Sequence, residues 1–267
     1  MNKKRIQYFP SFFVLLFFCF LFCGCDNALL ADDLLLARRA MADRNWSLAE
    51  RLLERYLGHE QDVDRRWEAW QELLVVTRSS SIKERITLEI LDSMLAEFAD
   101  DDGRAKVVLE NMGLVTESLK NYGRAADVWS TYIGLGGLSP SELVEGYRHL
   151  ATAQFAQRHF DAGEETLAQC MALPAADREK LLCAYDLADY QMARQRPQEV
   201  SDLCQQILDS EPDKDLRGMA GYLLGDALEQ LGRQREALHQ FEFAKQDYPN
   251  PLVIDSRIAY LRSVMKK

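Results

Sequence analysis

Apolar residues recur along this chain at the spacing of one helix face, from about residue 30 to the C-terminus. The runs "RRWEAWQELLVVTR" at 65–78 and "IKERITLEILDSMLAEF" at 82–98 each predict one amphipathic helix. Leu, Ala, Glu, Gln and Arg, which favour helices, are abundant, whereas the 267 residues include only 7 prolines and 14 glycines. The pattern therefore predicts an all-α protein.

Short polar stretches that favour turns separate the predicted helices. They read "ADDDGR" at 99–104, "GLGGLSPSE" at 134–142, "LPAADRE" at 173–179 and "DSEPDKD" at 209–215. In the second of them, Ser139 and Glu142 form a capping box, and Pro140 takes the first helical position. We therefore expect a helix to begin at Pro140.

The stretch 218–251 reads "GMAGYLLGDALEQLGRQREALHQFEFAKQDYPNP" and carries small and large residues at fixed spacing. Gly225 and Ala237 are small enough for two helices to approach closely, and Phe241 fills the space between them. This spacing resembles the tetratricopeptide repeat, a helix hairpin of about 34 residues with the pattern W-x₂-L-G-x₂-Y, then A-x₃-F, then P. Gly221 departs from the pattern, which has a bulky residue there. The matching positions are Leu224, Gly225, Leu228, Ala237, Phe241, Ala244 and Pro249.

The same register recurs toward the N-terminus. Copies fall at 181–214, 144–177, 106–139 and 30–63, and a degenerate copy falls at about 64–99. The copy nearest the N-terminus matches the pattern at Leu36, Ala37, Ala49, Leu53 and Tyr56. The resemblance implies a right-handed α–α superhelix, a solenoid of about six helix hairpins.

A closing helix is expected after the last repeat. The segment "LVIDSRIAYLRSVMKK" follows Pro251 and is amphipathic. Each repeat buries its core only against its neighbours, so the last one needs a cap. We expect the cap to cover it with Leu252, Ile254, Ile258 and Leu261.

The N-terminus has the pattern of a secretory signal, with basic residues at 3–5 and an apolar run over 9–23. The following motif "LFCGCDN" resembles the lipobox of bacterial lipoproteins, with Gly24 as the small residue and Cys25 as the lipid acceptor. Phe22 departs from the leucine that the lipobox prefers. The resemblance implies acylation of Cys25, by palmitate or similar chains, which anchors a protein stably to a membrane. The alternative is an ordinary signal peptide cleaved near "LLA" at 29–31.

These features divide the chain into a lipoprotein signal peptide at 1–24, a lipidated tether at 25–29 and a helical solenoid at 30–267. The resemblance to lipoproteins implies a lipid-anchored protein of the bacterial cell envelope that faces the periplasm or the cell exterior. Whether the membrane is the inner or the outer one stays open.

Net charge narrows the classes of partner. Loss of residues 1–24 removes three basic residues and no acidic ones, so the net charge changes from −10 to −13. Such an acidic body repels phosphate groups and argues against nucleic-acid binding and against lying flat on anionic lipid. We expect no nucleic-acid partner.

No motif of the sequence predicts an enzyme. The segment 98–109 fails as a calcium loop because Phe98 and Leu109 stand where oxygen ligands are required, so its aspartates are interpreted as a helix start. The four histidines lack the spacing of metal ligands, and there is no nucleophile elbow, P-loop or dinucleotide-binding loop. We therefore expect no catalytic residue, cofactor or metal.

Three cysteines remain after Cys25. Cys170 falls near the end of one helix and Cys183 near the start of the next, 13 residues later, where stacked repeats face one another. They are interpreted either as a disulfide, which an oxidising compartment permits, or as two small core residues. Cys204 is expected to be a buried thiol.

A binding surface follows from the resemblance, which implies that the first helix of each hairpin lines the concave face. The motif "YDLAD" at 185–189 recurs as "YLLGD" at 222–226, so Tyr185 and Asp189 repeat 37 residues later. Aromatic platforms beside carboxylates suit a peptide that bears Lys or Arg. The alternative is that the tyrosines pack between helices and the aspartates are merely solvated. The predicted groove residues are Arg148, Phe155, Tyr185, Asp189, Met192, Tyr222 and Asp226.

The function expected from this resemblance is that of a non-catalytic scaffold or adaptor, which holds other envelope proteins or peptides in its groove and supports assembly of an envelope complex. The alternative is a recruiting factor that transiently delivers an envelope hydrolase or protease to its target.

Overall fold

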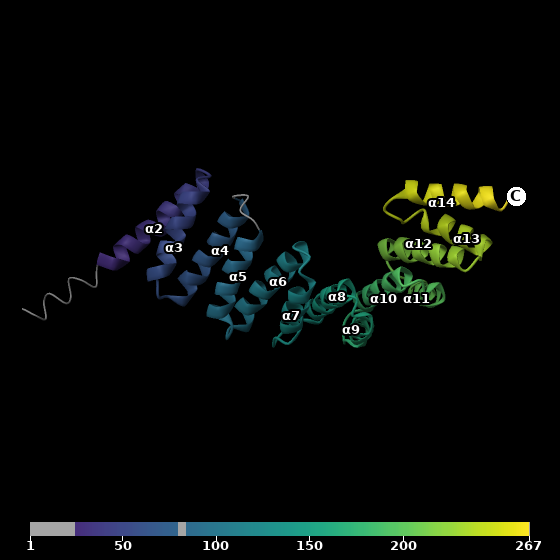
Figure 1. Ribbon diagram of the computed structural model, residues 1–267, viewed down its shortest axis with the longest axis horizontal. Coiled ribbons are helices and arrows are strands. Elements are labelled where there is room, and N and C mark those ends of the chain that lie inside the picture. The colour runs from purple at the N-terminus through teal and green to yellow at the C-terminus, as the bar shows by residue number, and fades with distance from the viewer. Residues whose placement is uncertain (1–24, 80–83, 267) are drawn as a thin grey trace, which may run out of the picture. The chain divides into compact units, whose positions relative to one another are not determined.

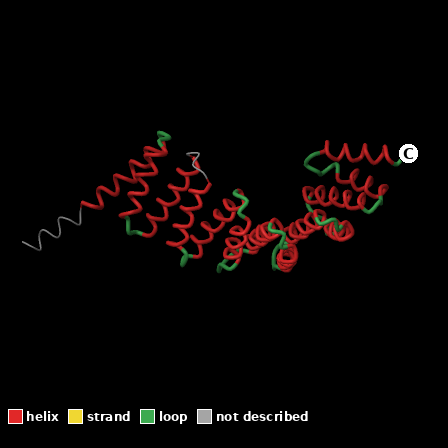
Figure 2. Tube along the Cα trace, in the orientation of Figure 1, coloured by secondary structure: helices red, strands yellow, loops and turns green. Residues whose placement is uncertain are grey.

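The computed structural model describes the backbone of residues 25–79 and 84–266. Within these ranges the chain forms thirteen α-helices and no strand, which confirms the all-α prediction (Figures 1 and 2). The helices are α2 (Cys25–Ala42), α3 (Trp46–His59), α4 (Val63–Ser79), α5 (Glu84–Phe98), α6 (Asp102–Ser118), α7 (Tyr122–Ile133), α8 (Pro140–Ala156), α9 (Phe160–Ala172), α10 (Asp177–Ala193), α11 (Pro197–Asp209), α12 (Lys214–Gln230), α13 (Gln234–Ala244) and α14 (Pro251–Val264).

The predicted signal peptide, residues 1–24, lies outside the described residues. Residues 25–29, interpreted as a tether, belong to helix α2, and the side chain of Cys25 also lies outside the description. In the parts of the chain that are described, no helix combines the length and the apolar character needed to cross a lipid bilayer.

The described helices pair into six hairpins, α2–α3 through α12–α13, followed by α14. Five of the hairpin turns in the described residues share one backbone feature, a residue with a positive φ of 56 to 76° two places before the second helix. A residue in this left-handed conformation ends the first helix and reverses the chain. Four of these positions recur at steps of 37 or 38 residues, which confirms the predicted repeat. The five residues are Arg44, Lys120, Arg158, Gln195 and Gly232.

The chain divides into two compact units between Glu97 and Phe98. In the first unit, Ala37, Ala49 and Leu53, which match the repeat pattern, are fully buried. Leu36, which also matches the pattern, is 44% exposed. The helix face that carries Ala37 and Ala40 packs on α3, and a neighbouring position such as Leu36 points about 100° away from that face.

The second unit, α6 to α14, holds the predicted small-to-large contacts between paired helices. A methyl group added to Gly225 of α12 would lie 2.7 Å from the ring of Phe241 on α13, which is fully buried. Gly113 faces Trp129 in the same way across α6 and α7. These glycines allow helices to pack at a distance that any side chain would increase.

The start of α8 has the predicted capping box. The Ser139 hydroxyl accepts from the backbone N–H of Glu142, and the Glu142 carboxylate accepts from the backbone N–H of Ser139. Lys106 of α6 donates to the same carboxylate at 2.6 Å. The ion pair with Lys106, followed by the hydrogen bonds from Ser139, lowers the pKa of Glu142 to about 2. The capping residue therefore also ties α8 to the preceding hairpin.

The C-terminal helix α14 caps the last hairpin as predicted. Ile254, Ile258 and Leu261 are buried against α12 and α13. Leu252 is 77% exposed, so its predicted covering role is wrong. The three buried residues follow the i, i+4, i+7 spacing of one helix face, and Leu252 lies on the opposite side.

Candidate partner-binding groove

The first helices of the last three hairpins lie in a row, with α10 in contact with both α8 and α12. Two adjoining cavities open over α8 and α10, with volumes of about 520 Å³ and about 200 Å³. Thr152 and Tyr190 line both of them, so the two form one continuous site, which we name the α8–α10 groove. The larger cavity, the apolar pocket, is lined by Tyr122, Thr152, Phe155, Ala156, Phe160, Tyr190, Ala193 and Arg194. The smaller cavity, the polar pocket, is lined by Glu145, Arg148, His149, Thr152, Asp186, Asp189 and Tyr190.

The apolar pocket is built on a fixed pair of aromatic rings. Tyr190 of α10 stacks on Phe155 of α8, with ring centroids 3.8 Å apart and ring planes 13° apart. The Tyr190 hydroxyl donates to Thr152 Oγ1 at 2.9 Å. Gly163 of α9 lies directly behind Phe155, where an added methyl group would meet the ring at 2.6 Å. The rings are therefore held in place before any ligand arrives, which lowers the entropy that binding must overcome.

One edge of the apolar pocket carries a cation that is already paired. The Arg194 guanidinium lies over the Phe160 ring, 4.8 Å from its centroid, and forms an ion pair with Glu164. Ala156 and Ala193 also line this pocket, and both are exposed. Small exposed residues at these two places leave the rings of Tyr190 and Phe160 partly exposed, while Phe155 behind Tyr190 is buried.

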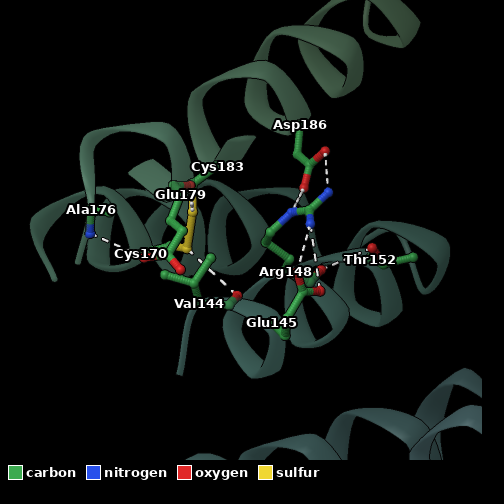
Figure 3. The surroundings of a disulfide bond; sticks show 9 residues. All are labelled: Val144, Glu145, Arg148, Thr152, Cys170, Ala176, Glu179, Cys183 and Asp186. Carbon is green, nitrogen blue, oxygen red and sulfur yellow. Dashed lines mark hydrogen bonds and ion pairs between the residues drawn. A yellow bond between two sulfur atoms is a disulfide. The ribbon is translucent and has the colours of Figure 1, made fainter. Parts of the chain in front are cut away.

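The polar pocket contains more carboxylates than cations. Arg148 Nε donates to Asp186 Oδ2 at 2.6 Å, and Arg148 Nη1 donates to Glu145 at 3.2 Å (Figure 3). The third carboxylate, Asp189, makes no hydrogen bond or ion pair to any described residue. Partial desolvation and then the nearby charge of Asp186 raise the pKa of Asp189 above its usual value. An unpaired carboxylate in this setting favours the approach of a cation.

No protein-family model matches the chain, and no curated protein matches it. Solved structures do resemble it. A kinesin-light-chain repeat protein from Podospora anserina with tetratricopeptide-like repeats is 16% identical, covering 70% of this chain and 96% of its own, with a TM-score of 0.55. A tetratricopeptide repeat protein from Parabacteroides merdae is 13% identical, covering 87% and 98%, with a TM-score of 0.51. The apo form of RapI is 10% identical, covering 89% and 72%, with a TM-score of 0.58.

The chain has the tetratricopeptide-repeat fold. At these identities the likeness establishes the fold alone.

Three of the predicted groove residues line the groove of this tetratricopeptide-repeat fold. Arg148 and Asp189 belong to the polar pocket and Phe155 to the apolar pocket. Tyr185 and Met192 pack instead against the core formed with α11 and α12. Burial raises the pKa of Tyr185 above its usual range, and the charge of Asp189 adds to the effect.

Tyr222 and Asp226 lie one hairpin further on and are covered by the C-terminal segment. The Tyr222 ring stacks on Tyr248, with centroids 4.6 Å apart. Arg257 of α14 donates to Asp226 at 2.7 Å and to Glu229 at 2.8 Å. The predicted tyrosine and carboxylate of α12 therefore contact the cap rather than an open groove.

Residues that the sequence did not reveal complete the site. Tyr190 lines both pockets, and Phe160, at the first position of α9, lines the apolar one. One signal was available in the repeat register, since Thr152 and Tyr190 lie 38 residues apart, as do Arg148 and Asp186. The two repeats are offset by 37 residues, so each contact joins a residue of α8 to the residue one place beyond its equivalent on α10, and opposite charges at a spacing of 38 indicate an ion pair.

A disulfide joins the two hairpins that carry the groove. Cys170 of α9 and Cys183 of α10 are bonded, with Cα atoms 6.1 Å apart, and both are fully buried (Figure 3). The bond links α9 to the helix that carries Asp186, Asp189 and Tyr190. Of the cysteine side chains that the structure describes, Cys204 is the free thiol, and burial raises its pKa to about 12.

Proposed function

We propose that this chain is a non-catalytic protein–protein interaction scaffold or adaptor of the bacterial cell envelope that binds a peptide segment of another protein in the α8–α10 groove. The observation that carries the proposal is the groove itself, in which a preformed aromatic pocket of about 520 Å³ adjoins an unpaired carboxylate. Pockets of this size that combine apolar walls with a few polar groups are typical of binding sites. Stacked hairpins present such surfaces on a rigid frame.

The two small residues on the walls of the apolar pocket allow a direct test. Ala156→Leu and Ala193→Leu fill the pocket without removing a packing contact, because both positions are exposed. Ala168→Leu places the same side chain on α9, at an exposed position that lines neither pocket. Partners that co-purify with the chain after mild detergent extraction should be lost from the two groove variants and retained by Ala168→Leu. Equal recovery from all three variants would reject the groove as the binding surface.

The proposed place of action is the membrane surface, with the chain anchored by lipid on Cys25. The support is the resemblance of "LFCGCDN" to a lipobox after a basic and apolar signal segment. Cys25→Ala should abolish labelling by radioactive palmitate and leave the precursor uncleaved. Normal processing of Cys25→Ala, together with release of the chain into the soluble fraction, would indicate an ordinary signal peptide instead.

A second function, transient recruitment of an envelope hydrolase or protease, is favoured by the short length of the groove. Where the structure describes the chain, the cap covers the equivalent face of α12, and the two pockets take their first-helix residues from α8 and α10. A short segment bound over so small an area dissociates readily. A partner recovered in stoichiometric amounts supports the scaffold, and a partner captured only by chemical crosslinking supports the recruiter.

A further inference from the structure

In the last hairpin, a cation from the chain itself neutralises carboxylates of α12. Arg257 of α14 donates to Asp226 and Glu229 of α12 at 2.7 and 2.8 Å. Beside this ion pair, Tyr248 from the segment before α14 stacks on Tyr222. A segment that follows the hairpin in the chain therefore covers α12 with one guanidinium group and one aromatic ring.

One repeat earlier, the equivalent position also carries an aspartate, Asp189, but no cation from the described residues pairs with it. Asp189 of α10 lies 37 residues before Asp226, as Tyr185 lies 37 residues before Tyr222. Arg148, the guanidinium of the polar pocket, is engaged by Asp186 and Glu145. No described side chain supplies a cation to Asp189, although it lines the pocket and is exposed to solvent. Asp189 therefore resembles Asp226 without the guanidinium that Arg257 supplies.

The aromatic surface beside Asp189 is also available. Tyr190, the next residue along α10, lines both pockets, so a group bound at Asp189 lies next to the stacked rings of Tyr190 and Phe155. The polar pocket carries three carboxylates, Glu145, Asp186 and Asp189, against the guanidinium of Arg148. Its charge therefore complements a cation, and the apolar pocket accepts an aromatic or large aliphatic side chain.

We propose that the segment bound in the α8–α10 groove carries a Lys or Arg whose cation pairs with Asp189, as Arg257 pairs with Asp226, and a nearby aromatic or large aliphatic side chain that enters the apolar pocket. This inference rests on the proposed function, because it specifies what the groove recognises. The occupant is a basic and aromatic segment of another protein. Residues 1–24 of the same chain and a second copy of the chain are alternative occupants that the experiment distinguishes.

The test uses the full chain in mild detergent and fluorescein-labelled Gly/Ser peptides that contain one Arg and one Phe. Four peptides place the two residues one to four positions apart, and matched peptides replace Arg by Gln or Phe by Ala. Binding is measured by fluorescence anisotropy at low ionic strength, because salt screens an exposed ion pair. Asp189→Asn removes the carboxylate charge from the groove, and Asp202→Asn removes the same charge from an exposed position on α11 outside the groove.

At least one Arg–Phe peptide should bind, about tenfold more weakly to Asp189→Asn than to the unaltered chain. The Gln–Phe peptide should bind both proteins equally, and Asp202→Asn should change affinity less than about twofold. Failure of every Arg–Phe peptide to bind, or equal binding of the Arg–Phe peptide to Asp189→Asn, would overturn the inference.

The same measurements separate this inference from the proposed function. If Ala193→Leu abolishes peptide binding and Asp189→Asn leaves it unchanged, the groove is the binding surface but Asp189 does not pair with the peptide. If neither variant changes binding, both the groove as binding surface and the role of Asp189 are rejected. If the chain dimerises with increasing concentration and Ala193→Leu abolishes the dimer, the occupant of the groove is a second copy. If a synthetic peptide of residues 1–24 binds more tightly than every Arg–Phe peptide, the occupant is the chain's own N-terminus. Either result overturns the proposed partner.

Discussion

Substitution of Gly225 by alanine should destabilise the second unit, although alanine is the better helix former. The added methyl group would lie 2.7, 2.8 and 2.9 Å from three carbon atoms of the Phe241 ring. Real side chains do not approach so closely, and Phe241 is fully buried, so its ring has little room to move. The substitution therefore forces α12 and α13 apart or moves the ring away from its preferred rotamer.

The expected magnitude is the difference between two opposing effects. Overpacking of a well-filled core costs about 1 to 3 kcal/mol. Replacement of glycine by alanine in a helix interior stabilises by about 1 kcal/mol. The free energy of unfolding should consequently fall by about 1 kcal/mol, with an upper limit of about 2 kcal/mol.

The assay is urea unfolding of the chain without residues 1–24, followed by circular dichroism at equilibrium. Gly123→Ala in α7 is the matched control, because its added methyl group meets its nearest neighbouring atom, on Gln157, at 3.8 Å, an ordinary contact. This control should be as stable as the unaltered chain or slightly more so. If Gly225→Ala is as stable as Gly123→Ala, the close contact between α12 and α13 is wrong.

Three further predictions concern bonds that join one helix to another. Replacing Cys170 and Cys183 together by alanine, or reducing their bond, should lower the free energy of unfolding by about 3 kcal/mol, because the bond closes a loop of 13 residues. An unchanged midpoint of urea unfolding in reducing agent would contradict this prediction. The folded-state pKa of Glu142, about 2, lies below its ordinary value of 4.5. The ionised carboxylate of Glu142 therefore contributes about 1 kcal/mol, after solvent screening, to the free energy of unfolding. This contribution is complete above pH 4.5 and is lost as the pH falls toward 2. Glu142→Gln should flatten the dependence of the free energy of unfolding on pH over this range. Arg257→Ala leaves the carboxylate of Asp226 partly buried without its cation and should cost about 1 to 3 kcal/mol, and Asp226→Asn in the same chain should restore part of the loss in thermal unfolding.

The fold was predictable because a tetratricopeptide-like hairpin is specified by contacts close in sequence. Gly225 and Phe241 are 16 residues apart and belong to one hairpin, so their sizes and spacing alone indicate that two helices meet there. The capping box at Ser139 and Glu142 is equally local, and it marks the beginning of α8 correctly.

The groove was predicted only in part, because its shape depends on contacts between repeats. Asp189 and Asp226 look alike in the sequence, and Arg257, 31 residues after Asp226, decides that one is covered and the other open. Leu252 appeared suitable for the cap by composition, but it lies on the side of α14 opposite Ile254, Ile258 and Leu261 and is exposed. Tyr190 was missed because its role depends on its stacking against Phe155 on another helix.

Site-specific photocrosslinking shows whether the α8–α10 groove holds a partner in the cell. A photoreactive amino acid at Glu145, which lines the polar pocket, is compared with the same amino acid at Gln169, an exposed residue of α9 outside both pockets. Irradiation should give a protein adduct from position 145 and none from position 169, and Ala193→Leu should remove the adduct. Adducts of equal yield from both positions, or none from position 145 in cells that contain the folded protein, would show that the groove is not the partner-binding surface.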